Sequence, residues 1–191
     1  MKIKLAELEK KLNYKLQRDS YVLGVDTASI TGLAIIETDK TYVKLSTSIF
    51  KLPAVDSADE TSTKYVGKLE SMLSLIREFK KELKPKKNSI LILENSFLGV
   101  NPVTFGILRM LSGIIFAELY DIFEHIYLVF PMTARKDVGF KSQLKKGVKS
   151  IEKKKEIIAW INDKFNLNET NDNITDAILL ALWGLKQKEE K

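Results

Sequence analysis

The spacing of hydrophobic positions along the chain predicts a mixed α/β domain. Short apolar runs bounded by turn residues indicate β-strands at 21–26, 31–37, 41–50, 89–94 and 126–130. Apolar residues three or four positions apart indicate amphipathic helices at 2–17, 63–83, 103–123, 151–165 and 173–187. The first three strands follow one another through short turns. We therefore expect an antiparallel meander that continues into βα units with parallel strands.

The N-terminal segment 1–19 differs from the strands that follow it. Apolar residues recur there at near-helical spacing among lysines and glutamates, at Ile3, Leu5, Leu8, Leu12 and Leu16. We expect an added amphipathic helix, followed by one main domain over 20–187, because 191 residues suit one domain better than two. This helix is expected to pack on the domain, and an arm that contacts a second subunit or DNA is the alternative.

The composition excludes several kinds of chemistry. The chain has no cysteine, so disulfides, thiolate zinc sites and cysteine nucleophiles are excluded. His125 is the only histidine, which also excludes a zinc site built from several imidazoles. Hydrolytic chemistry would therefore rest most naturally on carboxylates and a hard divalent cation such as Mg²⁺.

The charge of the chain suits a polyanionic partner. Lysine and arginine total 31 against 25 acidic residues, a net charge of +6. Seven lysines crowd into the stretch 141–155, which is either a solvated face or a phosphate-binding surface. No apolar run approaches the ~20 residues of a membrane span, and the first residues do not form a signal peptide. We expect a soluble, cytoplasmic protein that does not bind membranes.

Three acidic residues stand where a metal site would form. Asp26 and Glu94 each end an apolar strand, and Asp176 opens the apolar run of the last helix. Ligands of α/β sheets bind at the carboxyl ends of strands, so adjacent strands would bring Asp26 and Glu94 together. Asp172 lies about one helical turn before Asp176. The structural alternatives are that Asp26 begins a turn and that Asp172 or Asn173 caps the helix.

Four segments resemble, in the same order, the motifs of RuvC-type Holliday junction resolvases of the RNase H-like superfamily. They are GVDTASITGLAII at 24–36, ILENSFLGVN at 92–101, SIEKKKEIIAWI at 150–161 and NDNITDAILLALWG at 171–184. The resemblance covers residues 21–184 and implies an RNase H-like fold. In that fold a mixed five-stranded sheet is flanked by helices, here with an extra N-terminal helix.

The resemblance also implies the site residues. Asp26, Glu94 and Asp176 match the family's metal-binding and catalytic acids, and Lys154 matches its active-site lysine. Asn173 stands at a metal-ligand position where the family has an aspartate or a histidine, and the neighbouring Asp172 is the alternative ligand. An amide oxygen can coordinate a metal but carries no charge.

DNA-binding residues are implied less directly. Phe97 matches an aromatic residue that stacks near the junction crossover, and its alternative role is to anchor the loop after Glu94. Asn101 matches a polar residue near the scissile region, and its alternative role is to cap the next helix. The basic segment adds candidate phosphate contacts at Lys145, Lys146 and Lys149.

The function implied is that of an endonuclease dependent on Mg²⁺, with Mn²⁺ able to substitute, that resolves four-way DNA junctions. The family acts as a homodimer, which makes the helix at 103–123 the candidate interface. Three alternatives remain: an RNase H-like nuclease with another DNA or RNA–DNA substrate, a junction-binding protein with weak or no catalysis, and an actin-like kinase. The chain length and the missing glycine-rich phosphate loops argue against the kinase.

Overall fold

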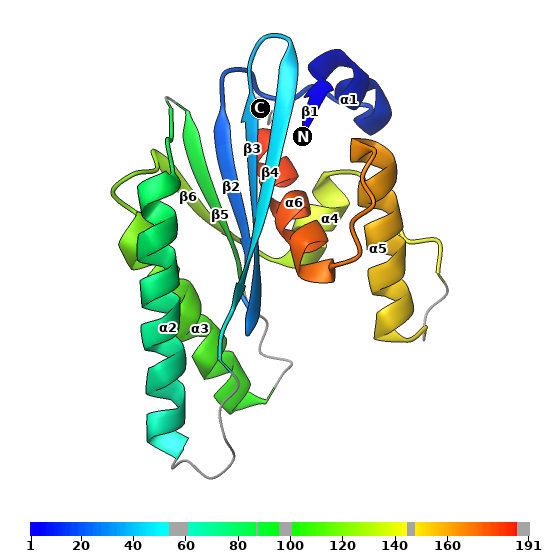
Figure 1. Ribbon diagram of the computed structural model, residues 1–191. Helices are drawn as coiled ribbons and strands as arrows, with labels where there is room; N and C mark the ends of the chain where they lie inside the picture. The colour runs from blue at the N-terminus through cyan, green and yellow to red at the C-terminus, as the bar shows by residue number, and fades with distance from the viewer. Residues whose placement is uncertain (54–60, 87, 96–100, 145–147, 187–191) are drawn as a thin grey trace.

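A mixed β-sheet forms the centre of the protein, and helices cover both of its faces (Figure 1). The computed structural model describes residues 1–53, 61–86, 88–95, 101–144 and 148–186, the side chains of 61–64 excepted. The strands are β1 (Lys2–Lys4), β2 (Tyr21–Asp26), β3 (Ile30–Thr38), β4 (Tyr42–Lys51), β5 (Ser89–Glu94) and β6 (His125–Val129). They lie in the order β1-β4-β3-β2-β5-β6. Strands β2, β3 and β4 form the expected antiparallel meander, and β5 and β6 run parallel to β2.

The sheet has six strands in the described residues, where the sequence predicted five. The extra strand is β1, which pairs antiparallel with β4 so that Ile3 lies opposite Val43. The predicted helix at 2–17 is correspondingly shorter, α1 (Leu5–Leu12), and ends at Asn13 in the left-handed conformation with φ 62°. Ile3 fits the helical spacing, but the open edge of β4 offers backbone partners that the spacing cannot reveal.

Helices pack on the two faces of the sheet as separate sets. They are α2 (Thr61–Glu82), α3 (Pro102–Leu119), α4 (Pro131–Asp137), α5 (Ser150–Phe165) and α6 (Asp172–Leu185). One face packs on α2 and α3 through Leu23, Leu91 and their neighbours. The other face packs on α6, with α1, α4 and α5 outside it. The sequence did not predict α4, which lies between the last strand and the lysine-rich stretch.

Helix α6 lies directly against the sheet. A Cβ atom added to Gly24 would lie 2.2 Å from the carbonyl oxygen of Ala177, and one added to Gly32 would lie 2.1 Å from that of Asn173. At Gly184 an added Cβ would lie 2.8 Å from a side-chain carbon of Val22. These three glycines let the helix and the strands approach more closely than side chains would allow.

A partly buried ion pair fixes the N-terminal segment. The Glu9 carboxylate, with a side chain only 6% exposed, accepts hydrogen bonds from Arg18 Nη1 at 2.7 Å and Nη2 at 3.0 Å. It also accepts one from the Leu16 amide at 2.8 Å. The Arg18 guanidinium lowers the pKa of Glu9 to about 2. Leu16 pairs with Lys186 beyond the end of α6, so this segment lies against the main domain, as expected for a packed helix.

Candidate active site

The first two acids lie at the end of the sheet where β2 and β5 finish. These strands are parallel neighbours, with Val25 opposite Leu93, so Asp26 and Glu94 occupy the next position of the register. Side chains alternate along a strand, and Gly24 and Ile92 both face α6. Asp26 and Glu94 therefore face the same helix. Asp26 is 8% exposed, so its carboxyl group is almost fully withdrawn from water.

The first turn of α6 brings the third acid to the same place. Gly32 lies opposite Asp26 in the sheet, and the Asn173 backbone lies over Gly32. The helix is capped by Asn171, whose side chain accepts hydrogen bonds from the amides of residues 173 and 174 at 2.9 and 3.4 Å. The N-cap is therefore neither Asp172 nor Asn173. Asp172 and Asp176 are four residues apart and share one face of the helix.

Two of the four acids, Asp26 and Asp176, have pKa values raised by their surroundings. Burial raises the pKa of Asp26 well above its usual range. A hydrogen bond with Glu94 and the charges of Glu94, Asp176 and Asp172 add to the rise. Burial also raises the pKa of Asp176, although the Arg135 guanidinium opposes that rise. Concentrated negative charge of this kind favours the binding of a cation.

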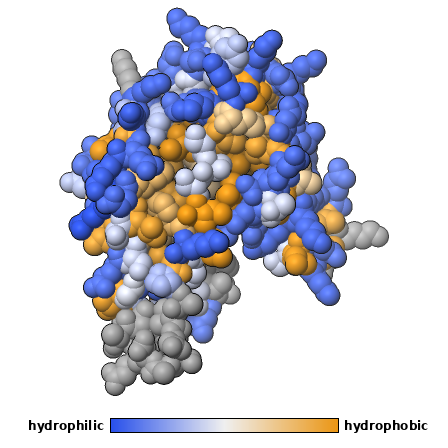
Figure 2. All heavy atoms as spheres, viewed as in Figure 1, coloured by the Kyte–Doolittle hydropathy of each residue, from blue (hydrophilic) through white to orange (hydrophobic). Residues whose placement is uncertain are grey.

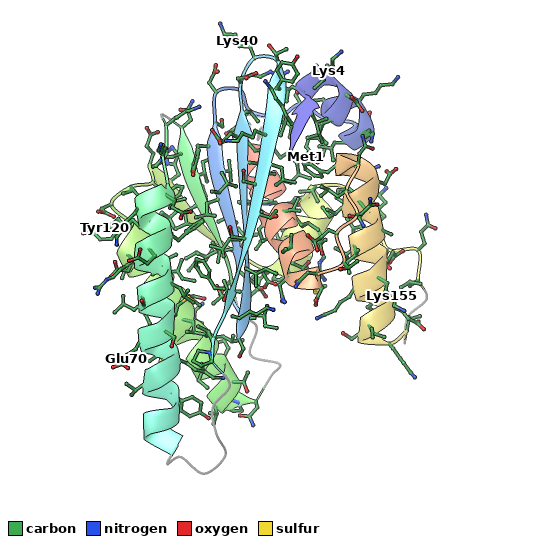
Figure 3. All side chains as sticks on the ribbon, in the orientation of Figure 1. Met1, Lys4, Lys40, Glu70, Tyr120 and Lys155 are labelled. Carbon is green, nitrogen blue, oxygen red and sulfur yellow. The ribbon has the colours of Figure 1, made fainter. Side chains whose placement is uncertain are left out.

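Two of the acids pair with basic side chains. Arg135 Nη2, from α4, donates to Asp176 Oδ1 at 2.9 Å and Oδ2 at 3.2 Å. Lys154, from the first turns of α5, forms an ion pair with Asp172, which raises the pKa of the lysine. Figure 3 shows the neighbouring Lys155 on α5 at the end of the molecule where α6 begins. Neither Asp26 nor Glu94 has a basic ion-pair partner among the described residues.

The donor set suits a hard divalent cation. Asp26, Glu94 and Asp176 offer carboxylate oxygens of the kind that Mg²⁺ prefers. Within the described ranges, however, no three carboxylate or imidazole groups stand close enough to hold one ion together. Two of the acids, Asp176 and Asp172, are paired with Arg135 and Lys154.

The predicted DNA-binding residues have different positions. Asn101 caps α3, because its Oδ1 accepts a hydrogen bond from the Val103 amide at 2.9 Å. Lys149 is exposed and immediately precedes α5, so it lies near Lys154 in the chain. Phe97, Lys145 and Lys146 lie outside the described residues. All five remain predictions as DNA contacts.

Arg135 was not among the site residues predicted from the sequence. It lies on the seven-residue helix α4, which is too short to show a clear period. Pro131 at the start of that helix, followed by the buried Ala134 and Val138 four residues apart, is the signal that could have indicated it. His125 lies at the opposite end of β6, beside Ile90, and takes no part in the acidic cluster.

Comparisons with known proteins relate this chain to one fold. No protein-family model matches the sequence, and no curated protein matches it. Among solved structures, Thermus thermophilus RuvC in complex with a Holliday junction substrate matches with a TM-score of 0.61, covering 86% of this chain and 91% of that one at 14% identity. A second T. thermophilus RuvC structure matches with a TM-score of 0.55, covering 85% and 92% at 14% identity. The chain therefore has the RNase H-like fold of RuvC, as its motifs predicted.

Proposed function

We propose that this protein is a metal-dependent endonuclease that cleaves branched DNA, in particular four-way junctions, as a homodimer. One observation carries the proposal: Asp26 and Glu94 end adjacent parallel strands and face the helix that bears Asp176. The same fold in T. thermophilus RuvC accommodates a Holliday junction substrate, which supports branched DNA as the ligand class. The net charge of +6 agrees with a polyanionic partner.

Each residue of the site has a distinct task in this proposal. Asp26, Glu94 and Asp176 would hold one or two Mg²⁺ ions, with Asn173 or Asp172 completing the ligands. Bound Mg²⁺ supplies Lewis-acid polarisation of the phosphodiester and charge neutralisation at its oxygens. The ammonium of Lys154, whose side chain is 51% exposed, would stabilise negative charge on the phosphate. Phe97 would stack on an opened base beside the site.

The test is cleavage of a four-way junction, a linear duplex, single-stranded DNA and an RNA–DNA hybrid, each with and without Mg²⁺. We expect paired, symmetric nicks in the junction only with the metal. Asp26→Asn should remove them, whereas Asp39→Asn should not, because Asp39 is exposed at the β3–β4 turn. Faster cleavage of the hybrid would replace the proposal with another RNase H-like nuclease.

The basic segment is proposed to bind phosphates. Replacing Lys145, Lys146 and Lys149 together with alanine should weaken binding to all DNA. It should also flatten the slope of log K against log salt by up to ~3, about one for each phosphate that is no longer neutralised. Replacing Lys40 and Lys84 with alanine is the control and should leave the slope unchanged. Both side chains are exposed, and Lys40 lies at the end of the sheet away from the acidic cluster (Figure 3). An unchanged slope in the triple variant would mean that these lysines only face solvent.

The dimer is proposed to form through α3. This helix is long and apolar enough, by length and composition, to cross a membrane, and only 22% of it is buried in the protein. Leu111, Ile115 and Leu119 form the buried face of α3, while its Met110 and Phe116 are 56% and 47% exposed. Figure 2 shows a separate hydrophobic area, over the sheet in the middle of the view, with hydrophilic side chains around it.

Two features of α3 favour a second protein copy as its partner. Gly106 and Gly113 lie seven residues apart, on one face, and a Cβ atom at either would meet nothing within 4 Å. Such a stripe lets the backbone of a second helix approach closely. In addition, Arg77 of α2 pairs with Glu118 at 3.0 Å, which holds α3 on its own domain and argues for a protein partner over insertion into a bilayer.

Light scattering tests the dimer. We expect twice the monomer mass for the wild type and the monomer mass for Met110→Glu. Val66→Glu, at an exposed apolar position of α2, should remain dimeric. A wild type with the monomer mass would contradict the homodimer. So would a wild type that binds lipid vesicles through α3 and floats with them.

A junction-binding protein with little catalysis is the second candidate. It is favoured by Asn173, which carries no charge where the family has an acid or imidazole, and by the two acids already paired with Arg135 and Lys154. Tight binding to four-way junctions with no cleavage in Mg²⁺ or Mn²⁺ would identify it.

A further inference from the structure

Arg135 is placed where a metal ion would contact Asp176. A single guanidinium nitrogen lies 2.9 Å from one carboxylate oxygen and 3.2 Å from the other, so it sits between them. The pair is only partly open to water, with side chains 28% and 18% exposed. A charge-assisted contact of this kind is stronger than an exposed ion pair and competes directly with a cation for the same oxygens.

A second acid of the cluster is neutralised in the same way. Lys154 pairs with Asp172, whereas Asp26 and Glu94 have no cationic ion-pair partner among the described residues. Two of the four carboxylates therefore have their charge offset without a metal. The buried negative charge would otherwise destabilise the folded protein.

We propose that Arg135 is a positioning residue that occupies Asp176 in the metal-free protein and is exchanged for a divalent cation when one binds. The inference rests on the proposed function, because it takes Asp176 as a metal ligand. A positive guanidinium beside the site repels a divalent cation, and its hydrogen bonds must be broken before Asp176 can turn toward the metal. Arg135 therefore sets how much free metal the site needs.

The structure leaves room for the guanidinium to move. Arg135 lines a cavity of about 350 Å³ together with Met132, Phe140 and Lys153. Its buried Nε atom has no hydrogen-bond partner within the part of the chain that the structure describes. The released side chain, beside Lys153, would present a fork of donors that fits a phosphate of the substrate.

The experiment measures Mn²⁺ binding to the DNA-free protein by titration calorimetry. We expect Arg135→Gln to bind Mn²⁺ about tenfold more tightly than the wild type, which is the size of one charge-assisted hydrogen bond that no longer has to be broken. Lys136→Gln is the matched control, because it removes the same charge from the next, exposed position and should change the affinity less than twofold. Arg135→Lys keeps the charge with a different donor geometry and should fall between the two.

Weaker or unchanged Mn²⁺ binding by Arg135→Gln would overturn the inference and make Arg135 an ordinary structural partner of Asp176. If Arg135→Gln does not fold, unchanged affinity in Arg135→Lys overturns it equally. A wild type that binds no Mn²⁺ would overturn both the inference and the proposed metal dependence. Binding by the wild type with no response in the variants would leave the proposed function standing.

Discussion

The contact between Gly32 and Asn173 allows the candidate site to be tested without altering any acid. Gly32→Ala places a methyl group 2.1 Å from the Asn173 carbonyl oxygen, 2.4 Å from its carbon and 3.0 Å from the next amide nitrogen. All three are backbone atoms, so no side-chain rotation relieves the clash. The first turn of α6 must therefore move away from β3.

The size of the movement follows from the distances. Ordinary contact begins at 3.4 Å, so the carbonyl must retreat by about 1.3 Å. Overpacking of this kind costs about 1–3 kcal/mol of folding free energy. Because Asp176 lies one turn farther along the same helix, it moves relative to Asp26 and Glu94. A misplacement of about 1 Å at a reacting centre can lower the rate by about 10²-fold.

The assay pairs junction cleavage in Mg²⁺ with thermal unfolding. Gly32→Ala should fold at a lower melting temperature and cleave about 10²-fold more slowly, measured at a temperature where it remains folded. Gly67→Ala is the control, because a Cβ there meets nothing within 4 Å and alanine favours the helix by up to about 1 kcal/mol. Wild-type cleavage and stability in Gly32→Ala would refute the placement of α6 against β3.

Three further predictions concern single side chains. Asp26→Asn should abolish Mg²⁺-dependent cleavage yet leave junction binding, measured by gel shift, intact or tighter, because the site loses one negative charge. Cleavage at the wild-type rate in this variant would show that Asp26 is not part of the site. Asn173→Asp should lower the Mg²⁺ concentration needed for half-maximal cleavage, and Mn²⁺ should restore cleavage by the wild type where Mg²⁺ is too weakly bound. If Asn173→Asp has no effect and Asp172→Asn stops cleavage, Asp172 is the metal ligand instead. Glu9→Gln should lower the unfolding free energy in urea by about 2 kcal/mol at pH 7, less than the full pKa shift implies because Arg18 is 36% exposed. The Glu9 carboxylate has a pKa lowered from 4.5 to about 2, so its contribution is complete above pH 4.5 and should fade as the pH falls toward 2, whereas the exposed Glu7→Gln should change little.

The strands of the main domain could be predicted because each is a short apolar run with turn residues beside it. The relation between Asp26 and Glu94 followed from the same pattern, since two strands that end in acids meet at one edge if they are parallel neighbours. The helices at the two sheet faces also followed from their spacing. The strands and helices themselves depend on local sequence, whereas the pairing of β2 with β5 is a long-range contact that the pattern left as a condition.

Features that depend on distant partners could not be predicted. Strand β1 has three residues and exists because β4 has an open edge. Helix α4 has seven residues, fewer than a periodic pattern needs. The Arg135–Asp176 pair joins positions 41 residues apart, and nothing in either neighbourhood indicates the other. Asn171, rather than Asp172 or Asn173, is the cap because α6 begins one residue earlier than predicted.

The position of α6 after every strand in the chain has a consequence during synthesis. A growing chain can pair β2, β3 and β5 before α6 leaves the ribosome, since proteins are made at about 5–20 residues per second. Until then, Val22, Ile36 and Ile92 lack the helix that covers them and are open to association with other nascent chains. Asp176 lies on α6, so it is synthesised at the same late stage. A partly synthesised chain therefore lacks part of the acidic cluster, and the proposed nuclease activity would begin only after α6 packs on the sheet.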